Sequence, residues 1–319
     1  MKISITDKGA GITREFAHAI GATFRGRFID IPENMGTGYI TGFSWGKELR
    51  MMIRNYYLKE EVYIERTNEL EEGQEDIVFL LSGIFPSILQ PDEQISPEQA
   101  NIMICKHAIT SVLAMPSNTM FGSVTIAAAK QYLHQHFGNI DHPVVASVLE
   151  GKDNFVFETS ISKAIIHTAS EMLGQPVPEA LENHYYKLKC EELLCYVFAS
   201  LMQREVVPAT GMHIEDIKAI YAIKARLQAN LDGPPNIAAL AKEAGMSEPK
   251  LRKLFKQTFG KGVFEYYQSG RMQEAARLLK EKRLTVSEVG YQLGFANLSH
   301  FSRVFEQYMG IKPKKYSKM

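Results

Sequence analysis

One pattern occurs twice in the C-terminal part of the chain, and it limits the possible folds more than any other feature. The two copies are IAALAKEAGMSEPKLRKLFKQTFG (residues 237–260) and VSEVGYQLGFANLSHFSRVFEQYMG (residues 286–310). Equivalent residues lie 49 positions apart up to the central glycine, Gly245 or Gly294, and 50 positions apart after it. The extra residue of the second copy therefore falls in the turn after the glycine, where an insertion is tolerated better than in a helix.

Each copy predicts two helices joined by a tight turn. In the first copy, Leu240 and Ala244 keep the spacing of a buried helical face. Gly245 supplies the left-handed backbone that ends a helix at little cost. Ser247, and Asn297 in the second copy, are residue types that cap the following helix by accepting hydrogen bonds from its free amide groups.

The segment between the copies, residues 262–282, has the apolar periodicity of a helix despite Gly270. About 20 residues at ~1.5 Å each span ~30 Å, which is close to the ~34 Å between successive major-groove faces on one side of B-DNA. A single helix-turn-helix pattern is more often a plain helical hairpin. Two copies joined by one helix favour a domain that reads two adjacent turns of the major groove.

The second helix of each copy is predicted to contact DNA, because its outer face carries cations and small polar side chains. The residues expected at the interface are Lys250, Arg252, Lys253 and Lys256 in the first copy, and Asn297, Ser299, His300, Ser302 and Arg303 in the second. Arg303 is equivalent to Lys253, so both copies place a cation at the same position. Since the second helix is less basic, we expect the first unit to carry more of the sequence discrimination.

Further motifs accompany the repeat. They are A-x3-G-M-S-x3-L-x2-L-F (241–255), Tyr266 followed by Arg271 and Ala275, G-F-A-N-x-S-H-F-S-R-x-F (294–305) and G-I-K-P-x-x-Y (310–316). With these motifs, roughly the last hundred residues resemble the AraC/XylS family of bacterial transcription regulators. The chain departs from the family pattern at Ser317, where arginine is commoner, and at Pro249, where some relatives have a base-contacting side chain.

The resemblance implies a cupin-like barrel ahead of the DNA-binding domain, with a small-molecule effector inside it and dimerising helices after it. It also implies RNA polymerase as a partner and activation as the commoner outcome. The stretches HYYKLKCEELL (184–194), Pro234-Pro235 and FGKGVFEYYQSGRMQEAARLL (259–279) are also similar to the siderophore-responsive branch, the regulators of the pyochelin and yersiniabactin type.

Charge is divided unevenly along the chain. From Glu215 onward there are 19 Lys and Arg against 10 Asp and Glu, whereas the residues before it carry 17 and 26. This split is expected of a DNA-binding module attached to a domain that stays off the phosphates. The sequence shows no secretory signal core and no apolar run near the ~20 residues that a membrane helix needs. We therefore expect a cytoplasmic protein without a membrane partner.

Residues 1–122 are predicted to be rich in β-structure. Segments such as GYITGFSW (38–45), LRMMIRNYYL (49–58) and DIVFLLSGIF (76–85) combine β-branched and aromatic residues and are separated by turn residues. Six or more such strands without intervening helices favour a sandwich or a small barrel. The candidates for an effector pocket are Tyr39, Trp45, Arg50, Arg54 and Tyr63, with arginine suited to an anionic ligand.

Helical periodicity is predicted from about Ser123, with helices near residues 125–136, 142–149, 160–173 and 178–204. The last helix either pairs with its copy in a second chain or packs in an internal bundle, and the resemblance favours pairing. The expected chain is thus α+β and multidomain. It has a cupin-like regulatory domain (1–122), a helical dimerisation subdomain (123–207), a linker (208–213) and an all-α DNA-binding domain with two helix-turn-helix motifs (214–319).

No residue pattern points to catalysis, a cofactor or a metal. His134 and His136 are two residues apart on a predicted helix and so diverge, and a structural zinc site with His142 would need four ligands. Cys105 and His107 share one strand face, but two ligands are not a site. The cysteines, Cys105, Cys190 and Cys195, form neither a disulfide framework nor a CxxC motif. A ligand-responsive regulator is favoured over a DNA-binding protein whose N-terminal domain only dimerises, and an enzyme fused to a DNA-binding domain comes third.

Overall fold

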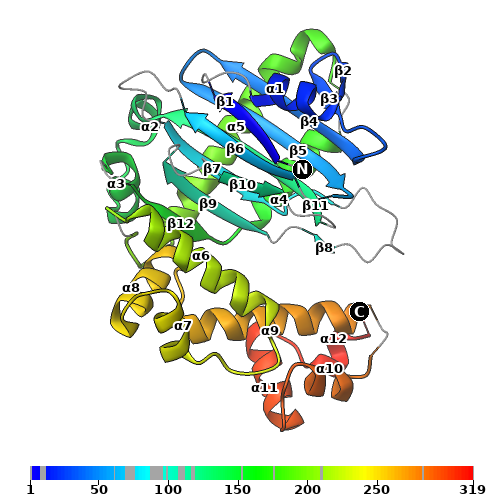
Figure 1. Ribbon diagram of the computed structural model, residues 1–319, viewed down its shortest axis with the longest axis vertical. Coiled ribbons are helices and arrows are strands. Elements are labelled where there is room, and N and C mark those ends of the chain that lie inside the picture. The colour runs from blue at the N-terminus through cyan, green and yellow to red at the C-terminus, as the bar shows by residue number, and fades with distance from the viewer. Residues whose placement is uncertain are drawn as a thin grey trace. The chain divides into compact units, whose positions relative to one another are not determined.

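The computed structural model describes residues 2–7, 12–60, 62–68, 76–86, 96–97, 100–106, 112–115, 119–151, 154–174, 177–208, 211–281 and 284–318. The chain divides into two compact units, Met1–Met212 and His213–Met319. The first unit combines sheets with helices, and the described part of the second is helical (Figure 1).

The first unit is built on one large, mostly antiparallel sheet. Its strands follow the order β12-β9-β7-β11-β5-β4-β3-β2, and each strand along this path is antiparallel to its neighbour. The short strand β8 (Ser96–Pro97) pairs in parallel with β11. The bounds are β2 Thr23–Arg25, β3 Phe28–Asp30, β4 Gly36–Trp45, β5 Leu49–Leu58, β7 Asp76–Ser82, β9 Asn101–Lys106, β11 Thr119–Ala129 and β12 Val156–Thr159.

A second, three-stranded sheet has the order β1-β6-β10, formed by Lys2–Asp7, Val62–Asn68 and Val112–Met115. Among the strands that the structure describes, the large sheet keeps two open edges, β12 and β2, so the closed barrel expected from the sequence is wrong. The reason lies in strand pairing, because β6 pairs with β1 on one side and with β10 on the other, and none of these three strands bridges those edges. The antiparallel sheet remains consistent with a cupin-like domain.

Side chains of β5 alternate between two apolar cores. Leu49, Met51 and Ile53 lie in the larger core, which also contains side chains of the helices. Tyr56 and Leu58 lie in a smaller core on the other face, together with residues of β3, β4 and helix α1 (Ile12–Ile20). The large sheet therefore has one face packed against the helices that follow β11 in this unit and a second face on which α1 packs.

The helices of the first unit are α2 (Lys130–Phe137), α3 (Pro143–Glu150), α4 (Lys163–Gly174) and α5 (Glu179–Met202), besides α1. The helix predicted from Thr125 begins only at Lys130, because β11 continues to Ala129 as a central strand paired with both β5 and β7. Strand β12 also lies within the segment predicted to be helical. Helix α5 shares its core with the large sheet, as in the ring contact of Phe198 with Phe79.

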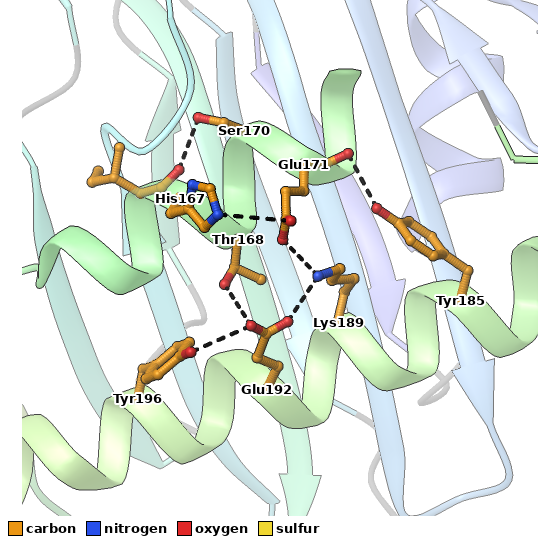
Figure 2. Close-up of polar contacts among 9 residues, drawn as sticks. His167, Thr168, Ser170, Glu171, Tyr185, Lys189, Glu192 and Tyr196 are labelled. Atoms are coloured by element: carbon orange, nitrogen blue, oxygen red, sulfur yellow. Dashed lines mark hydrogen bonds and ion pairs between the residues drawn. The ribbon is translucent and has the colours of Figure 1, made fainter. Parts of the chain in front are cut away.

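A polar network joins α4 to α5 (Figure 2). The Lys189 ammonium on α5 lies 2.7 Å from a carboxylate oxygen of Glu171 on α4 and 2.9 Å from one of Glu192. Thr168 donates a hydrogen bond to Glu192 at 3.1 Å, and the Tyr185 hydroxyl donates to the Glu171 carbonyl at 3.1 Å. These bonds, with the apolar contacts to the sheet, fix the rotation of α5 about its axis.

The second unit consists of α6 (Ile214–Ala229), α7 (Ile237–Glu243), α8 (Glu248–Phe259), α9 (Val263–Lys280), α10 (Val286–Gln292), α11 (Leu298–Met309) and α12 (Pro313–Tyr316). It has two apolar cores. Val263 and Tyr267, in the first half of α9, pack with α6, α7 and α8. Met272 and Leu279, in its second half, pack with α10 and α11. Helix α9 is therefore common to both helical pairs.

No helix within the described part of the chain is long and apolar enough to cross a membrane.

Candidate nucleic-acid interface

The first helix-turn-helix consists of α7 and α8. Asn236 caps α7 by accepting a hydrogen bond from the amide of Ala239 at 3.0 Å. The chain then turns at Gly245, whose φ is +64°, and Ser247 caps α8 by accepting from the amide of Lys250. The predicted glycine turn and Ser247 cap are thus confirmed. Gly260 ends α8 in the left-handed conformation.

The second helix-turn-helix consists of α10 and α11 and repeats this construction. Asn297 caps α11 by accepting from the amides of Ser299 and His300 at 2.9 and 3.1 Å, as predicted. Gly294 has a φ of +74°. Thr285 and Glu288 form a reciprocal capping box at the start of α10. This box was not predicted, although its signal, a threonine followed three residues later by glutamate, is present in TVSE (residues 285–288).

Arg271 on α9 holds the second pair of helices against the shared helix. Its side chain is buried and donates hydrogen bonds to the carbonyl of Leu293, at the end of α10, and to Gln268. Its guanidinium also lies 3.9 Å from the ring centroid of Phe295. Burial lowers the pKa of the guanidinium. The motif that includes Tyr266, Arg271 and Ala275 marked this residue in the sequence, but not its contact with the end of α10.

The outer face of α8 carries the four cations predicted to contact DNA, and all four are exposed. Lys250 pairs with Asp216 of α6 at 2.8 Å, and Arg252 lies 3.4 Å from Glu248 one turn earlier. Lys253 and Lys256 make no hydrogen bond or ion pair with any residue that the structure describes. The two lysines are therefore free to meet an anion.

The outer face of α11 is less charged. Ser299, His300 and Arg303 are exposed, whereas Ser302 is half-buried. The His300 ring lies 5.8 Å from the ring of Phe295, and Arg303 has no partner among the described side chains. Asn297 uses its side-chain oxygen for the cap, so a contact of this residue with DNA would fall to its amide nitrogen. That these residues contact DNA stays a prediction.

The structure does not gather the residues predicted to line an effector pocket. Tyr39 and Trp45 pack against the larger core, and the Trp45 indole donates to the carbonyl of Asn183 on α5 at 3.0 Å. Arg50 and Arg54 extend from the opposite face of the large sheet, where Arg50 pairs with Asp76. Tyr63 belongs to β6, and its side chain lies outside the described residues.

The histidines considered for a metal site hydrogen-bond to the backbone instead. His134 contacts the carbonyl of Leu149 at 3.0 Å, His136 contacts that of Tyr132 at 2.8 Å, and His142 accepts from the amide of Val144 at 3.3 Å. Within the residues described, no group of three or more His, Cys, Asp or Glu side chains could hold a metal ion. His107 lies outside that set.

Comparison with known proteins agrees with the geometry of the second unit. A protein family described as "Helix-turn-helix domain" matches residues 240–319. The chain is 30% identical over 95 residues to the HTH-type transcriptional regulator GlxA of Rhizobium meliloti (strain 1021), covering 30% of this chain and 29% of that protein. It is 28% identical over 149 residues to the HTH-type transcriptional activator RhaR of Escherichia coli O139:H28 (strain E24377A / ETEC), covering 46% of this chain and 53% of that protein.

Among solved structures, the crystal structure of a probable AraC family transcriptional regulator from Rhodopseudomonas palustris CGA009 aligns with a TM-score of 0.30 and 27% identity. The alignment covers 32% of this chain and 95% of that one. The chain thus spans about half or less of the length of the curated relatives it matches. Its C-terminal part, residues 240–319, carries a helix-turn-helix domain, and the two curated relatives are a transcriptional regulator and a transcriptional activator of the HTH type.

Proposed function

We propose that this chain is a sequence-specific DNA-binding transcription regulator that inserts α8 and α11 into adjacent segments of the major groove. One observation carries the proposal. Lys253 and Arg303 occupy equivalent positions on two helices that are capped alike, end alike and pack against one shared helix, and both cations are exposed. Two equivalent cations held by one shared helix can contact two adjacent segments of the same DNA duplex.

The cations of the first unit have different roles in this proposal. Lys253 and Lys256 are unpaired within the described structure, so binding DNA releases no internal partner. Lys250 is paired with Asp216, and Arg252 lies close to Glu248, so each must share or exchange that partner to reach a phosphate. We assign the larger contribution to Lys253 and Lys256, with Arg303 on the second unit.

The test is selection from a randomised DNA pool by the full-length chain at two salt concentrations, followed by sequencing. The proposal expects a motif with two half-boxes about one helical turn apart. Retention that is independent of sequence and disappears with salt would reduce the domain to an electrostatic anchor and contradict the proposal.

The first unit is proposed to bind a small-molecule effector and to form a homodimer through α5. Three large apolar side chains on the outer side of α5 are exposed, Leu181, Leu188 and Met202, and Cys195 completes their seven-residue spacing. Such spacing is typical of a helix that packs against another helix. The opposite side of α5 is already buried in the core of the sheet, so the partner we propose is α5 of a second chain.

We propose activation through contact with RNA polymerase, in the cytoplasm, as the outcome of effector binding; a regulator whose first unit only dimerises is the alternative. The siderophore-responsive branch stays a prediction that depends on sequence motifs alone. Transcription from the recovered motif, measured in a purified system with and without candidate effectors, separates the two, because the alternative expects no response to any ligand.

A further inference from the structure

We infer that Arg54 on β5 and Ser123 on β11 form an anion-binding subsite in the first unit, and that the ligand is a small organic acid with an apolar body. This inference rests on the proposed function, since it takes the first unit to be the effector-binding unit. It adds the chemical class of the ligand and the side chains that recognise its charge.

Arg54 is unusual among the buried arginines of this protein. Its exposed fraction is 4%, and those of Arg204 and Arg271 are 8% and 7%. Arg204 donates to the carbonyls of Glu158 and Val206, and Arg271 donates to the carbonyl of Leu293 and to Gln268. Arg54 makes no hydrogen bond and no ion pair with any residue of the described structure, and its buried Nε has no partner.

A buried guanidinium N–H without a partner is costly, because it has lost its hydrogen bond to water and gained none from the protein. Among the described residues, the Arg54 guanidinium has one aromatic neighbour, Phe121, whose ring centroid lies 6.0 Å from the guanidinium carbon. That distance is at the limit of a cation–π interaction, and the ring can satisfy none of the five N–H donors of an arginine. A bound anion could accept hydrogen bonds from these donors and so provide the negatively charged acceptor that the described residues do not.

Ser123 adds a second donor at the same place. In the antiparallel pairing of β5 with β11, Ser123 lies directly opposite Arg54, so the two side chains leave the same face of the sheet side by side. The Ser123 residue is fully buried, and its hydroxyl also lacks a hydrogen-bond partner among the residues that the structure describes. A guanidinium beside a hydroxyl matches the two oxygens of a carboxylate, or two oxygens of a phosphate.

The surroundings of the pair select the rest of the ligand. Tyr56 and Phe121, next to Arg54 and Ser123 on the same two strands, form a ring pair with centroids 5.0 Å apart. Ile40 lies opposite Arg54 on β4 and is buried. These side chains favour an apolar body attached to the acid group and disfavour a highly charged ligand.

Arg50 provides an internal contrast. It lies four residues before Arg54 on the same strand and faces the same side, but it pairs with the buried carboxylate of Asp76. Its charge is therefore satisfied within the protein. Of the two arginines predicted from the sequence to line an effector pocket, the structure assigns the recognition of an anion to Arg54.

The experiment is isothermal titration calorimetry of the full-length chain with three probes. They are cyclohexanecarboxylate, its uncharged counterpart cyclohexylmethanol, and inorganic phosphate. Wild type should bind the carboxylate and not the alcohol. Binding of phosphate alone would identify a site for an inorganic anion and would overturn the inference that the ligand is an organic acid. Arg54→Met should weaken carboxylate binding at least tenfold, Ser123→Ala should weaken it several-fold, and Arg54→Lys should retain part of it. Arg50→Lys is the matched control and should bind as wild type does.

A second measurement guards against a variant that fails to fold. Without a probe, Arg54→Met removes an uncompensated buried charge, so the first unit should unfold about 2–4 °C higher than in wild type. A lower unfolding temperature would mean that Arg54 has partners within the protein and would overturn the inference. So would equal binding of acid and alcohol, or no binding of either anion. None of these results involves DNA, and Arg54→Met should bind DNA as wild type does, so a failure of the proposed DNA-binding function would be recognised separately.

Discussion

Two glycines in equivalent turns have the same backbone conformation but different surroundings. Gly245 and Gly294 both have positive φ, at +64° and +74°. A Cβ at residue 245 would meet no atom within 4 Å, whereas a Cβ at residue 294 would lie 1.7 Å from the carbonyl oxygen of Asp232. The second turn is therefore fixed twice, by its own conformation and by the loop that precedes α7.

This contrast predicts different costs for one substitution. Gly245→Ala should lower the free energy of unfolding by about 1–2 kcal/mol, the cost of a left-handed alanine. Gly294→Ala should cost several times as much or displace the loop at Asp232, because a backbone oxygen cannot rotate away. Amide hydrogen exchange of α7 and α10 in the two variants checks this. Equal protection losses would contradict the described contact.

Arg271 supports a second prediction at the scale of the residue. Arg271→Lys keeps the charge but loses the fork that reaches the Leu293 carbonyl and Gln268 together. We expect the free energy of unfolding of the second unit to fall by about 2–3 kcal/mol, within the range for a disrupted buried polar network. Denaturant unfolding measures it, with Arg226→Lys, an exposed arginine of the same unit, as the control.

At the scale of the element, the sequence predicted the helices of the second unit well because their signals are local. Glycines at the turns and capping side chains lie within a few residues of the backbone they control. The predictions were wrong where the structure depends on pairing between strands that are far apart in the sequence. Residues 125–129 continue as a strand because β5 and β7 flank them. The barrel does not close because β6 and β10 pair elsewhere.

The candidate sites follow the same division. The exposed cations of α8 could be assigned from periodicity, since one face of a helix is fixed by sequence spacing. The proposed effector residues were split between two faces, because spacing within β4 and within β5 does not reveal the register between them. That Arg54 has no partner within the described structure could not be predicted from the sequence, because it depends on which oxygen atoms of other strands and helices come within hydrogen-bond distance of its side chain.

Helix α5 carries a prediction about assembly. Leu188→Glu should convert the proposed dimer to a monomer, because the charge would be buried in the middle of the seven-residue stripe of Leu181, Leu188, Cys195 and Met202. Light scattering after size-exclusion chromatography measures the mass. Asn183→Glu introduces the same charge at an exposed position of α5 off the stripe and should leave the mass unchanged. A wild-type monomer at every accessible concentration would contradict the prediction.

At the scale of the whole molecule, the basic second unit predicts how single cations contribute to DNA affinity. Lys253→Ala and Arg303→Ala should each weaken binding to the selected motif by about 1–3 kcal/mol, roughly 5- to 150-fold. Loss of a base contact should also relax selectivity at one position. Lys256→Ala should weaken all sequences alike and reduce the salt dependence by about one ion if it contacts phosphate.

Fluorescence anisotropy with the selected and a scrambled duplex, over a series of salt concentrations, measures these effects. Lys218→Ala on α6, an exposed lysine beside Glu215, is the control and should bind as wild type does. Unchanged affinity in both Lys253→Ala and Arg303→Ala would mean that the outer faces of α8 and α11 are not the interface.

The sharing of α9 between two apolar cores has a consequence for the kind of operator such a protein can tolerate. Each half of the helix is buried in one core, and Leu231 packs against both, so the two helices proposed to read DNA are held in a fixed relation to each other. Two helix-turn-helix units joined by a flexible linker would accept half-boxes at many separations. Because α8 and α11 pack against one shared helix, we expect them to fit only one separation of the half-boxes. One base pair inserted between the half-boxes moves the second half-box by ~3.4 Å along the DNA axis and rotates it by about a tenth of a helical turn. Insertions or deletions between the half-boxes should therefore reduce binding to a promoter as much as the loss of one half-box does.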